Sequence, residues 1–458
     1  MTLLMGNLVN HLMLKTTASY FLTPLLAIGC IISFDLRYDL VGLTFTLLFA
    51  QSVIFLHFTF SRKAGLLTVY FIFALTFFSL IPWLHYSTNH FIWRTSPITE
   101  SIHLLVNLLI FLANITTILT YLYCARRTKK RPPLTALIKN KKLSAMALLA
   151  LSSLSFILLL YLNSFSITQI LFRGIIEENR EIVVESSSLS LLLGMIARLT
   201  PVFCFLYAAT QIKSSSATKT LLFTLMLLSV FPTGVARYMV AFAYIPLALL
   251  FIPTARNAVV FSTSLIFSLI FIFPFLEQFR KFSGISDLTL IPNSDFFYAA
   301  HFDAYENFAT AVEHDFITFG RQFLGTIFFF IPRTIWPNKP VGSGYEMAES
   351  LGYSFNNISM PFLGEGYINF GTAGVFIFAA LIGYLMARID SRFSKNKNEI
   401  APADYSLAVY FFLIGALFFL LRGDLLSSFA YISAGLIVAT LIEKTMKLIN
   451  SYNAPLKL

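Results

Sequence analysis

Apolar residues in this chain are grouped in blocks of about 20, separated by shorter polar segments. An α-helix of about 20 residues is as long as the hydrocarbon core of a bilayer is thick. Repeated blocks of that length are typical of a chain that crosses a membrane many times. The sequence therefore predicts an all-α polytopic membrane protein.

The composition argues against a water-soluble fold. Hydrophobic residues make up 57% of the chain and charged residues 12%, whereas about 25% of an ordinary soluble domain is charged. The net charge of +11 does not indicate a nucleic-acid partner, because the basic residues are concentrated in short loops. Cys30, Cys124 and Cys204 lie within or at the end of apolar blocks, so they provide neither a disulfide framework nor a metal site.

The apolar blocks predict about twelve spans, the first of which is expected to be an uncleaved anchor. The seventh and eighth are short and are separated by Pro232, Thr233 and Gly234. A long polar region, residues 277–368, divides the first nine spans (1–276) from the last three and the C-terminal tail (369–458). The predicted spans are 17–34, 40–60, 65–85, 101–124, 144–163, 189–212, 220–235, 238–253, 257–276, 369–387, 404–421 and 425–442.

Lysine and arginine predict the orientation, because short cytoplasmic loops retain an excess of them. Most of the 33 basic residues lie in alternate loops, including the run at 126–142. This distribution places the loop 126–142 and both termini in the cytoplasm. The loop 164–188, the region 277–368 and the turn at Arg422-Gly423-Asp424 are then on the opposite, external side.

We expect any chemistry in the external region 277–368, since a loop of that length between spans is usually functional or disordered and this one is rich in aromatic residues. His301–His314 has the apolar spacing of a helix. Arg321–Ile331 is apolar but too short to span, which predicts an interfacial or re-entrant helix. The prolines of FIPRTIWPNKP (Phe330–Pro340) predict an extended, bent segment, and a glycine-rich loop follows it.

Five arginines lie within an apolar block, at the outer end of a span or in the external region. An ionisable residue at membrane depth is costly and is a functional candidate. Guanidinium groups bind phosphate in a bidentate manner, so several of them predict a site for a multiply charged anion such as a lipid-linked pyrophosphate. For any one arginine, snorkelling or an ion pair with an acidic residue is an equally good interpretation. The five are Arg198, Arg237, Arg280, Arg333 and Arg422.

Carboxylates in the external segments are candidates for a general base that activates a sugar hydroxyl. Glu365, in the GEGY sequence before the tenth span, is the first choice, and a structural partner of an arginine is the alternative. Asp424 is expected to pair with a nearby basic group, and His301 and His314 fit the polar face of a helix. The sequence contains no metal-ligand or nucleotide-binding motif, which predicts chemistry without metal or cofactor, in which arginines stabilise the departing pyrophosphate.

Four sequences together resemble the Wzy-type polymerases of O antigen and related repeat-unit polysaccharides. They are FIPRTIWPNKP, PFLGEGYINFGTAG from Pro361, FPTGVAR ending at Arg237, and Arg422-Gly423-Asp424. The resemblance covers about residues 190–440 in motifs and the whole chain in topology. It implies a GT-C-like architecture in the bacterial inner membrane, with the active site facing the periplasm.

The resemblance also implies a reaction, in which a growing glycan moves from undecaprenyl pyrophosphate to the non-reducing end of a new lipid-linked repeat unit. A separate co-polymerase would control chain length. Glu365, Arg333 and Arg422 would be catalytic. Pyrophosphate or glycan would be bound by Arg198, Arg237, Arg280, Lys339, Trp336 and Asp424.

Three other functions are compatible with parts of this pattern. An O-antigen ligase would use the same donor and an external histidine, for which His301 or His314 could serve. A lipid-linked oligosaccharide flippase would use intramembrane arginines as a path, but it predicts short loops and two similar halves. A membrane O-acetyltransferase would need an intramembrane histidine near a cytoplasmic donor site.

Overall fold

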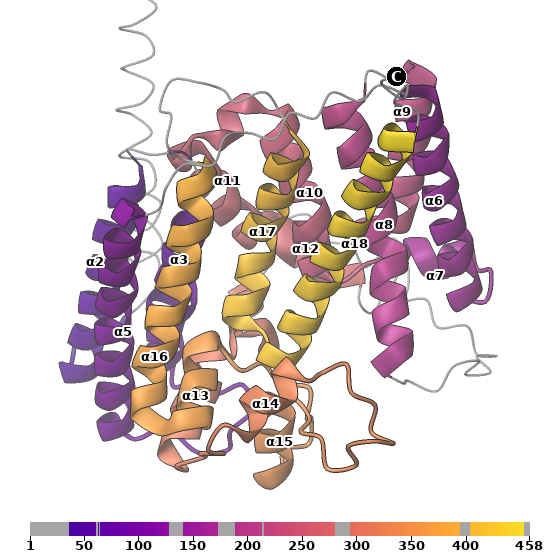
Figure 1. Ribbon diagram of the computed structural model, residues 1–458. Coiled ribbons are helices and arrows are strands. Elements are labelled where there is room, and N and C mark those ends of the chain that lie inside the picture. Colours follow the sequence, from indigo (N-terminus) through magenta and orange to yellow (C-terminus); the bar gives the residue numbers. More distant parts are fainter. Residues whose placement is uncertain are drawn as a thin grey trace, which may run out of the picture.

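The computed structural model describes residues 36–60, 63, 65–127, 141–172, 188–212, 215–279, 294–393 and 404–452 (Figure 1). These residues form a bundle of helices, and nine of the helical segments described are long and apolar enough to cross a membrane. Each of the nine coincides with a predicted span, so the all-α, multi-span prediction is confirmed. The nine are α2 (Leu40–Thr59), α3–η1–α4 (Leu66–Thr88), α5 (Glu100–Arg127), α6 (Lys141–Leu162), α8 (Ser188–Gln211), α11–η3–α12 (Ala258–Gln278), α16 (Phe362–Phe393), α17 (Tyr405–Arg422) and α18 (Leu425–Tyr452).

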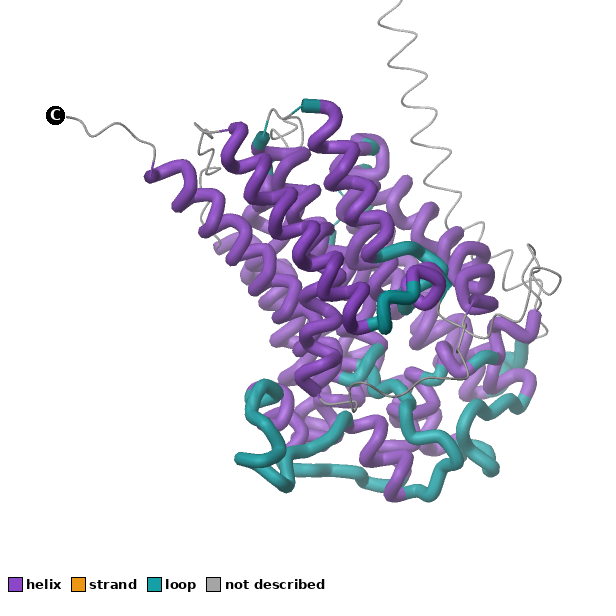
Figure 2. Tube along the Cα trace, turned by 90° about the vertical axis from the view of Figure 1, so that its right-hand side faces the viewer, coloured by secondary structure: helices purple, strands orange, loops and turns teal. Residues whose placement is uncertain are grey.

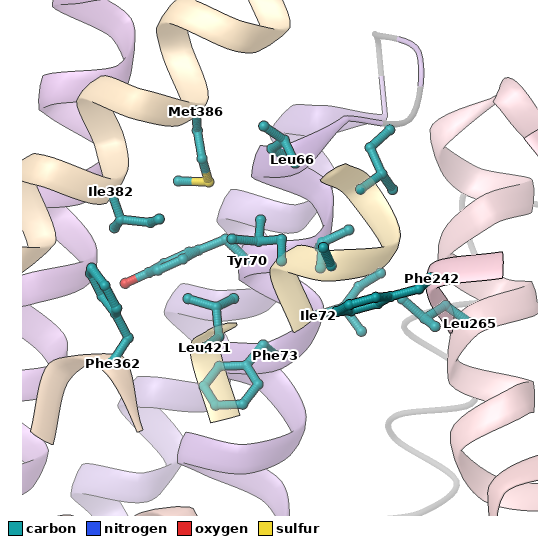
Figure 3. Close-up of a cluster of buried hydrophobic side chains, with 14 of the residues drawn as sticks. Leu66, Tyr70, Ile72, Phe73, Phe242, Leu265, Phe362, Ile382, Met386 and Leu421 are labelled. Carbon is teal, nitrogen blue, oxygen red and sulfur yellow. The ribbon is translucent and has the colours of Figure 1, made fainter. Parts of the chain in front are cut away.

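The α3–η1–α4 segment is the centre of the bundle. Its apolar stretch is 89% buried, whereas that of α2 is 39% buried and presents residues such as Leu47 and Ile54 on the outer surface. Figure 3 shows Tyr70 of α3 directed toward Ile382 and Phe362 of α16. Central and peripheral helices are equally apolar along their length, because lipid and protein interior favour the same side chains.

A buried carboxylate joins four helices at the end of the bundle away from α13. Asp390 of α16 accepts hydrogen bonds from the backbone N–H groups of Leu66 and Leu67 at the start of α3, at 3.0 and 3.4 Å. It also accepts from the hydroxyls of Tyr121 (α5) and Tyr410 (α17), at 3.0 and 2.8 Å. A carboxylate is favourable at a helix N-terminus, and these donors offset the cost of burying it.

Two of the predicted spans are short helices on either side of a break. α9 (Ser216–Ser229) has 14 residues and α10 (Arg237–Phe251) has 15, which corresponds to about 21 and 22 Å, less than the thickness of roughly 30 Å of a bilayer core. At the break, Gly234 packs on the backbone of Ile170 in α7 (Ile167–Leu171). The described residues contain nine long segments and this short pair, and the predicted first span 17–34 lies outside them, so the total of about twelve spans stays a prediction.

The short helices of the region 294–361 gather at one end of the bundle, which we call the α13–α15 end (Figure 1), and loops are abundant at this end (Figure 2). They are η6 (Ser294–Tyr298), η7 (Ala300–Phe302), α13 (Ala304–Glu313), α14 (Arg321–Ile327) and α15 (Ser343–Ser350). The helices predicted at 301–314 and 321–331 are confirmed in shorter form. The glycine-rich loop predicted after Pro340 is wrong in part, because it contains α15.

Helix α16 begins earlier than the predicted span and is sharply bent. Its backbone leaves the helical region at Phe370 and at Gly371, where φ is +63°, a conformation that glycine adopts readily. The arm 362–369 folds back on the helix, so that the backbones of Gly366 and Gly374 touch. A Cβ atom added to Gly374 would lie 1.9 Å from the carbonyl oxygen of Gly366.

Replacing Gly374 by alanine should therefore force the arm away from the helix. We expect the Gly374→Ala variant to lose at least the 1–3 kcal/mol of stability that is typical, roughly, of an overpacked core. The measurement is the melting temperature of the purified protein in detergent. The control is Gly194→Ala in α8, where an added Cβ would have open space around it. That control should be neutral or slightly stabilising, and an equal, small effect of the two changes would contradict the tight bend.

Candidate functional site

The turn between α17 and α18 organises the α13–α15 end through Arg422. The Nε of Arg422 donates to the carbonyl oxygen of His301 at 2.9 Å, and Nη2 donates to that of Ala300 at 3.2 Å. Nη2 also forms an ion pair with Asp303 at 3.0 Å. The side chain of Arg422 is 28% exposed and that of Asp303 is 1% exposed. The last residue of α17 thus fixes a loop that lies 121 positions earlier in the chain.

Asp303 accepts several further hydrogen bonds besides the ion pair. Its Oδ1 accepts from the hydroxyl of Ser359 at 2.5 Å, and its Oδ2 accepts from the indole N–H of Trp93 at 3.0 Å. The amide of Asn307 donates to Oδ2 at 3.0 Å. One carboxylate therefore connects α17, the loop before α5, the start of α13 and the segment before α16.

Glu365 and Asp424 lie together where α15, α16 and α18 meet. Glu365 is 1% exposed and accepts from the Ser343 hydroxyl at 2.7 Å and from the N–H of Leu425 at 2.9 Å. Asp424 lies against the N-terminus of α15, where the N–H groups of Ser343 and Gly344 face it. Sequence reasoning expected a basic partner for Asp424, but the structure provides these N–H groups and that of Ser427 at 3.1 Å.

Burial raises the pKa of Asp424 above its usual range, and the surrounding N–H groups act in the opposite direction. The neighbouring Glu365 carboxyl interacts with it electrostatically. Two neighbouring buried carboxylates oppose each other's ionisation. Asp424 caps the N-terminus of α15. Together, Glu365 and Asp424 join α15, α16 and α18.

Arg333 and Lys339 stabilise the proline-rich turn. Nη1 of Arg333 donates to the carbonyl oxygen of Lys339 at 2.8 Å. Nζ of Lys339 donates to the carbonyl oxygens of Phe329 and Ile331, at 3.0 and 2.8 Å. Burial, with a contribution from Arg333, lowers the pKa of Lys339. Neither side chain forms an ion pair with a carboxylate of the described residues, so no described acidic group balances the positive charge of the turn.

The position of this turn is set by α14 and α18. The side chain of Pro340 packs on Gly325 of α14, and the rings of Phe329 and Phe429 lie 6.0 Å apart, edge to face. Arg333 is exposed, Trp336 is half-buried and Lys339 is buried. Arg333, Trp336 and Lys339 thus belong to one turn at the α13–α15 end, and Arg333 is the most exposed of the three.

Arg198 and Arg237 lie on either side of the break between α9 and α10. Nη1 of Arg198 donates to the carbonyl oxygen of Ser229, the last residue of α9, at 2.9 Å. A cation is favourable at that end of a helix. Arg237 begins α10 and forms an ion pair of 2.7 Å with Glu277 at the end of α12. Arg280 lies outside the described residues.

An aromatic stack links this break to α17 and α18. The ring of Tyr238, next to Arg237, lies 4.3 Å from that of Phe419 and 5.5 Å from that of Tyr431, in nearly parallel planes. Phe419 precedes Arg422 by three residues, which places both on one side of α17. All three rings are half-buried. Arg237 begins α10 and Arg422 ends α17, and these two neighbouring helices meet at the stack.

The sequence did not indicate that Arg94 is a buried ion-pair partner, or that Glu306 binds backbone N–H groups of the loop before α5. Glu306 accepts hydrogen bonds from the N–H groups of Ile92 and Trp93, each at 2.7 Å. Burial raises the pKa of Glu306, and these N–H groups lower it. The guanidinium of Arg94 is 6% exposed and is paired with Glu313. The spacing of Asp303, Glu306 and Glu313 on one helical face was the available signal. The partners of Glu306 and Glu313 are more than 200 positions away in the chain.

The described residues contain no group of three His, Cys, Asp or Glu side chains that could hold a metal ion. A family model described as the O-antigen polysaccharide polymerase Wzy matches residues 16–450, nearly the whole chain. The chain belongs to the Wzy family. Among curated proteins and solved structures, none matches it.

Membership of the Wzy family confirms the family inferred from the four motifs and supports a transferase role in O-antigen synthesis. The nine apolar segments agree with a multi-pass membrane protein. The match includes the Arg422 turn, the proline-rich turn and the α9–α10 break. In this Wzy-family chain, the described arginines singled out by sequence therefore occupy three places: the break, the Arg422 turn and the proline-rich turn. Glu365 lies beside Asp424 in the arm of α16.

The ion pair between Arg422 and Asp303 should be a main determinant of stability at this end. Asp303→Ala leaves the partly exposed guanidinium without a counter-charge, and we expect a loss of about 3 kcal/mol, the lower end of the range for a broken buried pair. The change in melting temperature checks this value. Asp404→Ala, which removes only the cap of α17, should cost about 1 kcal/mol. A smaller effect at Asp303 than at Asp404 would contradict the role of the pair.

Proposed function

We propose that this protein polymerises lipid-linked repeat units. The growing glycan leaves undecaprenyl pyrophosphate and is joined to the non-reducing end of a new repeat unit, which remains on its own lipid carrier. The α13–α15 end faces the periplasm of a bacterial cell and both termini face the cytoplasm. The observation that carries the proposal is the positive charge of Arg333 and Lys339, which no described acidic group balances, in a chain of the Wzy family.

The proline-rich turn suits a departing pyrophosphate. Arg333 is exposed, and its bonds to the carbonyl oxygens of Lys339 and Pro340 leave other N–H groups of the guanidinium for an anion. Lys339 holds the turn from within and adds its charge. Fixed positive groups of this kind stabilise a leaving group without the cost of reorganising solvent. We assign Arg333 to the pyrophosphate, Lys339 to positioning of the turn and Trp336 to the glycan.

The α9–α10 break is the second part of the proposed site. The helix that begins at Arg237 directs its N-terminal N–H groups toward the break, as in membrane proteins whose broken helices bind anionic substrates. Arg198 and Arg237 would bind the donor together with Arg280, which follows Glu277 by three residues. The half-buried stack of Tyr238, Phe419 and Tyr431 offers ring faces to a sugar.

Arg422 and Glu365 receive different roles. Nε and Nη2 of Arg422 are bonded to the protein, which leaves Nη1 of this partly exposed side chain for the charge that develops at the reacting centre. Both oxygens of Glu365 already accept hydrogen bonds inside the protein. We therefore propose that Glu365, with Asp424, positions α15 and α18 rather than touching the acceptor hydroxyl.

The exposed guanidinium of Arg333 should be required for chain extension. We expect Arg333→Ala to lower the rate by roughly 100- to 1,000-fold, as when a preorganised donor is removed from an enzyme. Arg333→Lys should recover little, since a point charge does not replace a bidentate fork. The rate is measured with lipid-linked repeat units and purified protein in liposomes.

The matched control for Arg333 is Arg321→Ala. Arg321 lies in the adjacent α14, is also partly exposed, and its charge is balanced by Glu346. Polymer of normal length from Arg333→Ala, at normal protein level, would remove this arginine from the mechanism.

A surface-glycan gel from a strain that lacks the protein tests the function as a whole. A polymerase predicts that the ladder of chain lengths collapses to core plus a single repeat unit. Loss of all glycan from the core, with long polymer still on the lipid carrier, would instead indicate a ligase. Repeat units held on the cytoplasmic side would indicate a flippase, and an unchanged ladder would exclude all three functions.

A further inference from the structure

A small cavity lies at the α13–α15 end, apart from the arginine-rich places described above. It is enclosed by α4 (Ile81–Thr88), the loop that follows it, the start of α5 and α13. Three histidines line it, together with aromatic side chains. The exposed residues Asn89 and Pro97 are also in its lining, so the cavity opens at the surface of the loop. We call it the histidine cavity; its histidines are His85, His90 and His103.

A neutral imidazole has one donor and one acceptor nitrogen, and the hydrogen-bond partners define which nitrogen has which role. Nε2 of His85 lies 2.7 Å from the carbonyl oxygen of Phe297, and Nε2 of His90 lies 3.0 Å from that of Tyr298. A carbonyl oxygen only accepts, so Nε2 is the donor in both rings. Their Nδ1 atoms then carry lone pairs.

His103 has the opposite arrangement. Its Nδ1 lies 3.0 Å from the hydroxyl of Tyr305, and that hydroxyl donates its proton to Asn107 at 2.9 Å. The hydroxyl oxygen must therefore accept from Nδ1 of His103, which leaves the lone pair on Nε2. In the part of the chain that the structure describes, none of the three lone-pair nitrogens has a hydrogen-bond donor.

The chemistry of the cavity favours a neutral ligand with several hydroxyl groups. Neutral imidazoles with unused lone pairs accept hydrogen bonds, so they suit donors and disfavour an anion such as pyrophosphate. The Glu306 carboxylate, which also lines the cavity, is already bonded to the backbone of Ile92 and Trp93. The rings of Tyr86 and Tyr305 supply apolar faces beside these acceptors. Acceptors interleaved with aromatic faces match the edge of a sugar ring.

The size of the cavity limits what can enter it. Its free space of about 50 Å³ is room for a few water molecules, each of which needs roughly 10–15 Å³. Two or three hydroxyl or hydroxymethyl groups could replace that water, but a whole saccharide unit could not be enclosed. The ring of such a sugar would stay at the open mouth.

We propose that the histidine cavity binds the hydroxyl-bearing edge of one sugar residue of the glycan substrate, and that it holds water when no substrate is present. This proposal rests on the proposed function. Glu306 at the cavity and Asp303, the partner of Arg422, are three residues apart on one helical face. The cavity would thus hold a sugar about one helical turn from the Arg422 turn and set the position of the chain relative to the reacting bond.

Glutamine substitutions separate the two nitrogens of each ring. In His85→Gln and His90→Gln the amide N–H can still donate to the same carbonyl oxygen, while the rigidly held Nδ1 acceptor is replaced by an amide oxygen on a flexible chain, in a different position. We expect KM for the lipid-linked acceptor to rise roughly 2- to 12-fold per variant, the effect of one neutral hydrogen bond, with kcat unchanged. Soluble repeat-unit oligosaccharide, released from its lipid by mild acid, should inhibit the wild type and lose potency by the same factor.

His57→Gln is the matched control, because His57 in the last turn of α2 does not line the cavity; its KM should equal that of the wild type. Ile98→Phe narrows the cavity and changes none of the hydrogen-bonding side chains. It should also raise KM, and it replaces the glutamine variants if these have a lowered melting temperature. An unchanged KM in an active Ile98→Phe protein, or no inhibition of an active wild type by the released oligosaccharide, would overturn the histidine cavity alone. A wild-type protein that does not polymerise would overturn the proposed function instead.

Discussion

The ion pair between Arg422 and Asp303 is the contact on which the α13–α15 end depends. A carboxylate that is almost fully buried is costly unless it is paired and hydrogen-bonded, and Asp303 is both. Its partner ends α17, where a cation is favoured by the helix dipole. Because the same carboxylate binds Trp93, Asn307 and Ser359, losing either charge would release several segments at once.

The basic residues of the described segments differ in whether a carboxylate balances their charge. Arg94, Arg237, Arg321 and Arg422 each have a carboxylate partner. Arg333 and Lys339 are instead bound to carbonyl oxygens of their own turn, which fixes their positions, and neither has a carboxylate partner among the residues that the structure describes. The sequence alone does not distinguish these six residues, since each adds one positive charge. Only the pairing distinguishes Arg333 and Lys339 of the proline-rich turn from the other four.

The sequence predicts those features of the fold that depend on local properties. The length of an apolar block decides whether it can span a membrane, and all nine long segments were found in this way. Proline and glycine marked the break before Arg237. Burial was not predictable, because α3 and α2 are equally apolar and differ only in their neighbours. Helix α15 was missed because its cap, Asp424, comes from a distant part of the chain.

In the candidate site, too, the sequence predicts local features but not contacts between distant segments. A search for arginine at membrane depth identified Arg198, Arg237 and Arg422, since an isolated charge in an apolar block is visible without a structure. It assigned Glu365 a chemical role, because nothing nearby in the sequence reveals that Ser343 and Leu425 occupy its two oxygens. The three histidines of the cavity stand in different segments, and the partners that define their tautomers lie about 200 positions further on.

The capping of α15 by Asp424 has a consequence for biogenesis. Ribosomes make the chain from its N-terminus, so residues 294–361 leave the ribosome before α17 and α18 exist. Their anchors, Arg422 and Asp424, both belong to the turn between those last two helices. The α13–α15 end can therefore reach its final arrangement only after the last helical hairpin has entered the membrane, and a chain truncated before Arg422 would lack the contacts that assemble this end.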